Sequence, residues 1–353
     1  MRGWTLKLRD RDAVVTSEGI IFRVYGYFHP PRAYVCDVEY APSTIYRTDD
    51  PRAIRTGSGQ TYYKFYADGG LRFVMENYPQ YTVFYEPLGR RLVGVHEDQI
   101  VEIRKPDERL KRILKEPRDE LLEALHEVLG IVMDASGLKV SDFGVFGSLL
   151  HGFYHPSYSD LDLTVYGGEK IQRLREALKE LYMRGRIIQN EFADVDALRG
   201  KAWRFERYTT EEYIWHQRRK LIYGVYLGNR KIKVEFEPVK DWSEIKNEYD
   251  PKCRITWVGW VKAKARIADD KDAPYIPSIY ELENVRIIDG PRVADVKRVI
   301  SYVEEYRLQA FKGEDVYVEG NLERVETPSE VYHQITLTYG PRYYQQVLKV
   351  ARP

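Results

Sequence analysis

The amino-acid sequence predicts a multidomain α+β protein in which a central segment of mixed strands and helices separates two strand-rich segments. The chain has 353 residues, which is long for one domain and favours two or three. Apolar residues alternate as in strands before residue 105 and again after about residue 250. Between these segments they recur every three or four positions, as in helices. We therefore expect three parts, at residues 1–105, 106–249 and 250–353.

The first part is expected to be a small α+β domain. Its β-branched and aromatic residues alternate over several short runs, and glycine or proline residues separate these runs. We expect strands at residues 19–28, 61–66, 81–85 and 92–96, and a short helix at 71–77.

The central part shows helical periodicity in three places. Helices are expected over residues 110–114, 121–133 and 171–183, the second ending near Gly137 and the third at Gly185.

Other local patterns complete the central part. Thr209 and Glu212 have the spacing of a capping box, which predicts a further helix start. Short apolar strands are expected at 143–146 and 161–166. A hairpin is expected over 224–237, with its turn at Gly228-Asn229.

The third part is expected to be rich in strands. The strand candidates and the turn residues between them recur at a spacing typical of a small barrel or sandwich, of which an OB-like barrel is one form. The segment carries 16 basic and 16 acidic residues, so its charge gives no indication of a nucleic-acid partner. The expected strands are residues 255–265, 283–288, 294–301, 315–324 and 331–339.

Composition excludes several classes of protein. Lys and Arg total 55 and Asp and Glu total 54, so the net charge does not identify a partner. The two cysteines, Cys36 and Cys253, lie far apart and form neither a disulfide framework nor a zinc motif. The first residues are too charged for a signal peptide, and no apolar run approaches the roughly 18 residues of a membrane span. We expect a cytoplasmic protein with reduced thiols and no membrane partner.

The most informative segment runs from Gly144 to Tyr166. Asp160 and Asp162 stand two residues apart at the start of an expected strand, so both carboxylates point to one face, about 7 Å apart along the backbone. Two carboxylates this close resist joint ionisation, and a divalent cation removes that penalty. Mg²⁺ (or Mn²⁺), with carboxylate, water and phosphate oxygen ligands, is the expected cofactor.

A phosphate-binding turn is expected just before these carboxylates. Gly147 and Ser148 lie between the strand at 143–146 and a helix expected from Leu149. Glycine lets backbone N–H groups approach a ligand, and a helix N-terminus offers N–H donors to a triphosphate. A nucleoside triphosphate is therefore the expected ligand of Gly147, Ser148 and Leu149.

A third carboxylate is expected on a later strand. Alternation over residues 232–237 places Glu235 and Glu237 on the same face, with Ile232, Val234 and Phe236 on the other. The alternation leaves open which of the two glutamates faces the metal.

These motifs together resemble the DNA polymerase β-like nucleotidyltransferase superfamily. The resemblance covers about residues 118–240 and rests on Gly147-Ser148, the acidic–apolar–acidic run 160–162, and the later run 234–236. It implies a central mixed sheet with helices on one side, and two catalytic metals bound by Asp160 and Asp162. Glu235 then matches the residue that orients or deprotonates the attacking hydroxyl.

The implied reaction is attack by an acceptor hydroxyl on the α-phosphate of a nucleoside triphosphate, with release of pyrophosphate. The flanking segments resemble archaeal proteins that are described only as predicted nucleotidyltransferases, which indicates no acceptor. A non-catalytic nucleotide- or RNA-binding protein that retains the fold is the alternative.

Basic residues cluster within the central part. Residues 168–233 hold 16 Lys and Arg against 9 Asp and Glu. We expect Arg218 and Lys220 to contact phosphate, and the cluster could also bind an RNA end, although a solvated helix face is an equally good interpretation. The other members considered are Arg199, Lys201, Arg204, Arg207 and Arg219, with Trp203 and Phe205 among them. His151 and His155 flank the site and are expected to have structural roles.

Overall fold

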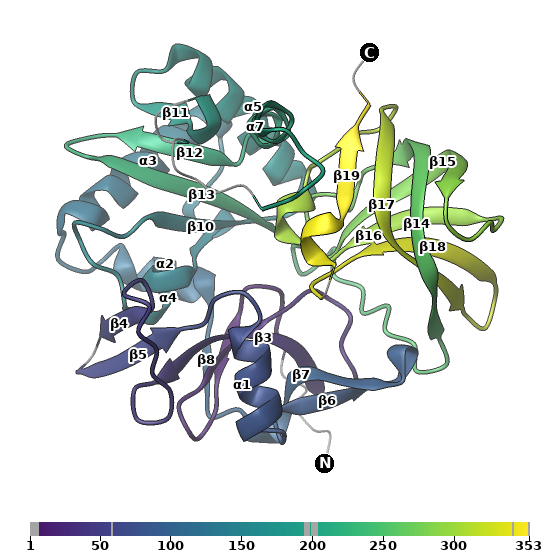
Figure 1. Cartoon of the computed structure of the whole chain (residues 1–353). Helices are drawn as coiled ribbons and strands as arrows, with labels where there is room; N and C mark the ends of the chain where they lie inside the picture. The colour runs from purple at the N-terminus through teal and green to yellow at the C-terminus, as the bar shows by residue number, and fades with distance from the viewer. Residues whose placement is uncertain (1–6, 58, 194–197, 199–203, 341, 352–353) are drawn as a thin grey trace. The chain divides into compact units, whose positions relative to one another are not determined.

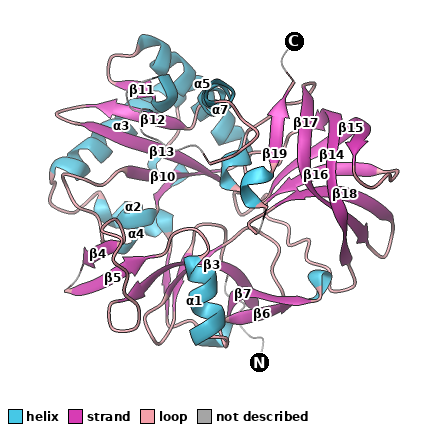
Figure 2. Ribbon diagram, viewed as in Figure 1, coloured by secondary structure: helices cyan, strands magenta, loops and turns pink. Residues whose placement is uncertain are grey.

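The computed structural model describes residues 7–57, 59–193, 198, 204–340 and 342–351. Within these residues the chain forms six α-helices and three β-sheets, which confirms the expected mixed α+β class (Figures 1 and 2). None of the described helices is long and apolar enough to cross a membrane.

Two compact units divide the chain. Each sheet falls within one of the three parts that the sequence predicts, but the first two sheets belong to one unit apart from residues 84–85 and 90. The first unit consists of Met1–Val83, Arg91–Ala193 and Leu221–Asn247, and the second of Phe84–Arg90, Asp194–Lys220 and Glu248–Pro353.

The N-terminal sheet has eight strands. Six lie in the order β4-β5-β3-β2-β1-β8, while β7 pairs with β3 and β6 pairs with β7. The helix α1 (Gly69–Asn77) packs on β3. The strands are β1 (Ala13–Val15), β2 (Ile21–Val24), β3 (Ala33–Pro42), β4 (Ile54–Gly57), β5 (Gln60–Lys64), β6 (Thr82–Tyr85), β7 (Arg90–His96) and β8 (Glu102–Arg104).

The N-terminal sheet buries apolar side chains on both faces. One face forms a core around Phe22, Val38 and Phe73. The other face buries Tyr40 and Tyr62 together with Leu150 and Phe153, which come from the central segment. The N-terminal sheet therefore packs directly on the part of the chain that carries the predicted site.

The central sheet is mixed, in the order β11-β12-β13-β10-β9. Strands β10 and β13 are parallel, and the other neighbours are antiparallel. The helix α5 packs on β10 and against α3. The strands are β9 (Phe143–Val145), β10 (Leu161–Tyr166), β11 (Ile188–Asn190), β12 (Tyr223–Leu227) and β13 (Lys231–Val239), and the helices are α2 (Pro106–Ile113), α3 (Glu120–Ser136), α4 (Gly147–His151) and α5 (Gly168–Arg184).

The predicted helix ends are confirmed. Gly137 and Gly185 terminate α3 and α5 in the left-handed conformation, with φ of 67° and 59°, which glycine adopts without a steric penalty. The turn before α4 is shorter than expected, because α4 begins at Gly147 and already includes Ser148.

The second unit contains a closed barrel. Its sheet runs β14-β15-β16-β18-β17-β19, and β14 also pairs with β17, which closes a path of five strands. Strands β16 and β18 are parallel, and the remaining neighbours are antiparallel. The strands are β14 (Arg254–Asp269), β15 (Ser278–Asp289), β16 (Val296–Ser301), β17 (Asp315–Glu326), β18 (Val331–Leu337) and β19 (Val347–Val350).

Among the described helices, α7 (Thr210–Lys220) belongs to the second unit. The predicted capping box is confirmed: the Thr209 hydroxyl accepts from the Glu212 backbone N–H (3.1 Å), and the Glu212 carboxylate accepts from the Thr209 backbone N–H (3.0 Å). Six 3₁₀ turns complete the described elements: η1 (Glu86–Leu88), η2 (Glu97–Gln99), η3 (Val140–Asp142), η4 (Glu191–Ala193), η5 (Glu304–Tyr306) and η6 (Tyr343–Gln345).

Candidate active site

Two carboxylates meet on neighbouring strands of the central sheet. In the parallel pair β10–β13, Asp162 is in register with Glu235 and Thr164 with Glu237. Residues in register project from the same face, so Asp162 and Glu235 lie side by side. The opposite face presents the buried side chains of Leu161, Leu163, Val165, Val234 and Phe236.

The electrostatic state of Asp162 reflects this crowding. Burial raises the pKa of its carboxyl group to about 7, and the negative charges of Glu235 and Asp160 act in the same direction. The positive charge of Lys64 opposes them. A carboxyl group with a raised pKa beside other carboxylates is a candidate functional residue, because a bound cation would favour its ionised form.

The turn that contains Gly147 touches Asp162. Gly147 has a φ of 58°, and a Cβ placed on it would stand 2.3 Å from the Asp162 carboxylate oxygen Oδ2. Only glycine permits both the left-handed backbone and this approach. The backbone N–H of Phe146 also donates to the Asp162 carbonyl oxygen (3.0 Å), so the turn and the acidic strand form one structure.

The predicted phosphate-binding residues lie at the start of α4. Ser148 is half-buried and the side chain of Leu149 is fully buried, so only the backbone of Leu149 can meet a ligand. The first hydrogen bond of the helix joins the Leu150 N–H to the Phe146 carbonyl (3.4 Å). The N–H groups before it are those that a helix leaves without an intrahelical partner.

The two candidate glutamates on β13 have different surroundings. Glu237 is fully buried and accepts hydrogen bonds from the Arg11 guanidinium, through Nε at 3.0 Å and through Nη2. Glu235 is half-buried and level with Asp162. Glu235 is therefore the better placed partner for Asp162, because the carboxylate of Glu237 neutralises an arginine.

Asp160 lies at the exposed end of β10, one residue before the strand begins. Partial burial of its carboxyl group raises its pKa; Lys233 and Arg230 lower it, and Glu191 raises it further. Lys233 pairs with Glu191 at 2.8 Å. Glu191 and Lys233 are therefore further charged neighbours of the site. Strand alternation in the sequence could have identified Lys233, because it shares a strand face with Glu235, but it gives no signal for Glu191.

Three side chains hold α4 in place. The Arg109 Nε donates to the Leu149 carbonyl (3.1 Å). The ring of His151 lies between Arg104, whose Nη1 is 3.2 Å from Nδ1, and Glu39, whose Oε2 is 3.3 Å from Nε2. Nδ1 must accept from the guanidinium, so Nε2 carries the proton that it donates to Glu39.

The ionisation states at this contact follow from burial. Burial lowers the pKa of His151 and outweighs the opposing effect of Glu39, so the ring is neutral. Burial acts to raise the pKa of Glu39, but the hydrogen bond from the neutral His151 ring and the charges of Lys64 and Arg11 lower it overall. His151 is thus structural, as the sequence indicated, and connects α4 to the N-terminal sheet.

The carboxylate oxygens at this face are the type of ligand that a hard divalent cation prefers. Asp162 and Glu235 are adjacent carboxylates that disfavour joint ionisation, and a cation would reverse that effect. The described residues do not contain a cluster of three or more His, Cys, Asp or Glu side chains arranged to hold a metal. The expected convergence of three carboxylates on one ion is therefore not seen, since Asp160 lies farther out, beside Lys233.

The basic residues predicted to bind phosphate belong to the second unit. Lys220 is fully buried, and its ammonium donates to the Glu305 carbonyl. This differs from the expectation, because a fully buried ammonium engaged by a carbonyl is not presented to a ligand. Arg219 pairs with Glu314, and Arg218 is exposed. Arg199, Lys201 and Trp203 lie outside the described residues.

The other basic and aromatic residues of that cluster are placed by contacts within the second unit. Arg204 is exposed, and its Nη1 donates to the Tyr344 hydroxyl (3.2 Å). Arg207 lies 3.8 Å from the carboxylate of Glu319. Phe205 is buried in the core of the barrel. Arg204 and Arg207 thus contact residues of the second unit and precede α7, so they do not belong to the helix face that the alternative interpretation expected.

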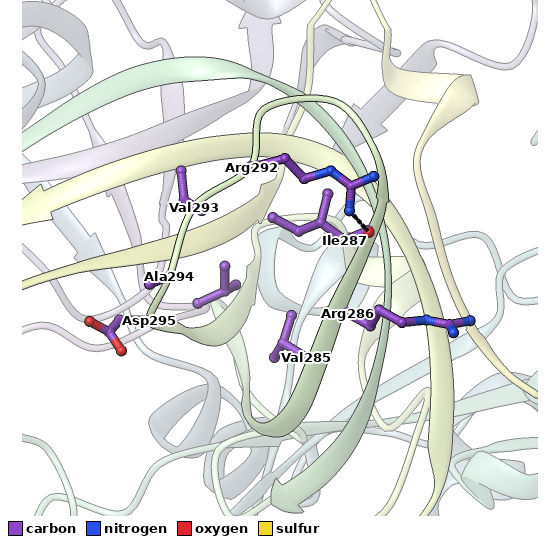
Figure 3. Close-up of a pocket in the computed structure, with 8 residues that line it drawn as sticks. Val285, Arg286, Ile287, Arg292, Val293, Ala294 and Asp295 are labelled. Atoms are coloured by element: carbon purple, nitrogen blue, oxygen red, sulfur yellow. Dashed lines mark hydrogen bonds between the residues drawn. The ribbon is translucent and has the colours of Figure 1, made fainter.

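A separate hollow of about 270 Å³ opens beside the β15–β16 loop of the barrel (Figure 3). Val285, Ile287, Val293 and Val296 give it apolar walls, and the guanidinium of Arg292 donates to the Ile287 carbonyl. It is smaller than the roughly 300–1,000 Å³ typical of ligand pockets. Asp295 is the only acidic residue in its lining, so it does not resemble the acidic face of the central sheet.

Comparison with known proteins gives one relative. A protein of Methanocaldococcus jannaschii, named only as uncharacterized, is 26% identical over 365 residues, covering 98% of this chain and all of that one. No family model and no solved structure matches the chain. The similarity extends over the residues of all three sheets, and the name of the relative carries no information on function.

Proposed function

We propose that this chain is a metal-dependent nucleotidyltransferase that transfers a nucleoside monophosphate from a triphosphate to an acceptor hydroxyl. One observation carries the proposal: Asp162 and Glu235 are in register on parallel strands, and the backbone of Gly147 closes against Asp162. Two-metal transfer requires carboxylates that hold cations beside a phosphate-binding turn, and this face combines the two.

The proposal gives each residue a role, and the positions of Asp162 and Glu235 support theirs most directly. Asp160, Asp162 and Glu235 would hold the divalent ions, Mg²⁺ or Mn²⁺, which stabilise the charge that develops on the attacking and leaving oxygens. The backbone N–H groups of Ser148 and Leu149 would bind phosphate oxygens. Glu235 would also orient or deprotonate the acceptor hydroxyl.

The proposal does not specify which molecule carries the acceptor hydroxyl. An RNA end is the partner that we propose to test first, since the closed five-strand path of the second unit supports an OB-like barrel, a fold that often binds single strands. The alternative is a non-catalytic nucleotide- or RNA-binding protein. The absence of three converging carboxylates among the described residues is the observation that favours it.

The test is transfer from each labelled nucleoside triphosphate with Mg²⁺, with and without total RNA. We expect label on an acceptor, release of pyrophosphate, and loss of both with EDTA. Asp162→Asn and Glu235→Gln should each reduce the rate by at least about 100-fold, because they remove cation ligands.

Asp134→Asn and Glu123→Gln make the same changes on the exposed face of α3 and should leave the rate unchanged. Transfer at the wild-type rate in Asp162→Asn would overturn the site assignment. Binding of a triphosphate without pyrophosphate release under any condition would support the alternative.

A further inference from the structure

The N-terminal sheet covers the helix that carries the predicted phosphate turn. The ring of Tyr40 on β3 lies 5.2 Å from His151 and 5.4 Å from Phe153, centroid to centroid. The ring of Tyr62 on β5 lies 4.8 Å from Phe153. His151 is the last residue of α4 and Phe153 follows it closely, so one face of the N-terminal sheet is turned toward the site.

Lys64 projects from that same face. It pairs with Tyr40 across β3 and β5, and it follows Tyr62 by two residues. Partners in register, and residues two apart on a strand, share a face. The half-buried side chain of Lys64 is therefore directed toward α4, beside Tyr40 and Tyr62.

A β-bulge on β3 directs the acidic side chain of Glu39 toward α4, as Tyr40 and Tyr62 are directed. The register between β2 and β3 shifts between Ile21 and Phe22, which leaves Glu39 as the extra residue of β3. A bulge redirects a side chain without ending the strand. Glu39 reaches His151 as a result, although Tyr40 next to it also faces that ring.

The positive charge of Lys64 acts on the carboxylates of the central sheet. Burial and Glu235 raise the pKa of Asp162, and the charge of Lys64 acts against both. Lys64 also helps to lower the pKa of Glu39. Strand geometry and electrostatics thus agree that a cation from the N-terminal sheet stands near the carboxylates of the central sheet.

We propose that Lys64 binds the phosphate groups of the nucleoside triphosphate. The inference rests on the proposed function. When divalent ions occupy Asp162 and Glu235, those carboxylates no longer need the ammonium as a counter-charge, and the phosphates are the anions that arrive with the ions. A lysine ammonium on a flexible stem suits this exchange of partners. Lys64 takes the role that the sequence analysis gave to Arg218 and Lys220.

The experiment measures binding of an α,β-methylene triphosphate analogue, which cannot be transferred, and of the matching monophosphate, both with Mg²⁺. Lys64→Gln should weaken triphosphate binding by roughly 10- to 100-fold, the effect of losing a charged hydrogen bond, and monophosphate binding by much less. Lys64→Arg should retain most of the affinity. Lys179→Gln removes the same charge from the exposed face of α5 and should change neither affinity.

The outcomes separate this inference from the proposed function. Triphosphate affinity within about threefold of wild type in Lys64→Gln would overturn the role of Lys64 alone. If the wild-type protein binds no triphosphate, both proposals fail. An equal loss for triphosphate and monophosphate would also overturn the inference, since it would show a general effect on the site. If Lys64→Gln lowers Tm, Lys64→Met, which keeps the apolar stem, replaces it in the same comparison.

Discussion

Asp12 is a fully buried carboxyl group just before β1. Burial raises its pKa to about 7, against a hydrogen bond from the Arg9 backbone N–H (3.0 Å) and the charges of Arg9 and Lys105. Unlike Asp162, it lies outside β10 and β13, and the acidic residue that adds to its raised pKa is Asp107. The two residues share a raised pKa for the same main reason, burial, and the proposed cation site includes Asp162 and not Asp12.

The pKa of Asp12 makes stability depend on pH. Between the unfolded pKa near 4 and the folded pKa of about 7, the folded state holds a proton that the unfolded state has lost, so stability falls as pH rises through this range. Asp12→Asn cannot titrate. We expect its Tm to vary less between pH 4 and 7 than that of the wild type, by scanning calorimetry, with the largest gain at pH 7 and above.

The control for this prediction is Asp134→Asn, at an exposed position of α3. It should follow the wild-type Tm at every pH. Parallel curves for Asp12→Asn and wild type would show that Asp12 is ionised in the folded protein throughout, contrary to the prediction.

The choice between Glu235 and Glu237 shows where sequence reasoning stops at the residue scale. Alternation along one strand places both side chains on the same face, and that placement follows from local geometry alone. The choice depends on the register with β10 and on Arg11, which is 226 positions from Glu237 in the sequence. Neither a strand register nor a contact this distant is encoded in a local pattern.

At the scale of elements, α4 is too short to be stable by itself. It spans five residues, and isolated helices need roughly 12–15 residues even to be marginal in water. Arg109, Arg104 and Glu39 therefore hold it from α2, β8 and β3, through Leu149 and His151. The position of Gly147 against Asp162 depends on these contacts.

His151→Ala tests whether the contacts of His151 with Arg104 and Glu39 hold α4 in place. It removes a buried ring and leaves Arg104 and Glu39 without their shared partner, so we expect the free energy of unfolding to fall by about 2–4 kcal/mol. Because α4 would be less fixed, the KM for triphosphate should rise. Denaturant unfolding and steady-state kinetics measure the two effects.

His151→Gln is the matched comparison. Its amide can donate to Glu39 and accept from Arg104, so part of the stability and of the KM should return. Equal loss in both variants would indicate that ring packing against Tyr40 and Phe153, rather than the two hydrogen bonds, holds the helix.

Elements with strong local signals were predictable, and the others were not. Helices α3, α5 and α7 follow from periodicity, terminal glycines and a capping box, all of which are local. The ten-residue β3 was not predicted, although Tyr34, Cys36, Val38 and Tyr40 are buried along it. Asp37 and Glu39 alternate with buried residues but are residue types that are uncommon in strands, which weakens the local signal, and pairing with β2, β5 and β7 stabilises the strand.

At the scale of the molecule, the first unit joins two sheets that the sequence separates at residue 105. Tyr40 and Tyr62 pack on Phe153, and His151 bridges to Glu39. A buried ion pair also joins the two sheets: Arg11, before β1, pairs with Glu237 on β13, and the two side chains are 2% and 1% exposed. Sequence periodicity assigns the strands of each sheet, but a pairing of two sheets depends on contacts that no local pattern contains.

Arg11→Met tests whether this link couples the two sheets. The substitution leaves the Glu237 carboxylate buried without its partner, so we expect a loss of about 3–5 kcal/mol in the free energy of unfolding. Glu237→Met leaves the Arg11 guanidinium buried and should cost a similar amount. In the double variant neither of these two charges remains and apolar side chains of similar volume fill the space, so much of the stability should return. The remaining loss reflects Asp10, which lies 3.8 Å from Arg11 and keeps its hydrogen bond from the Gly26 N–H. Urea unfolding of the four proteins completes the cycle, and a double variant whose loss equals the sum of the two single losses would show that Arg11 and Glu237 do not stabilise one another.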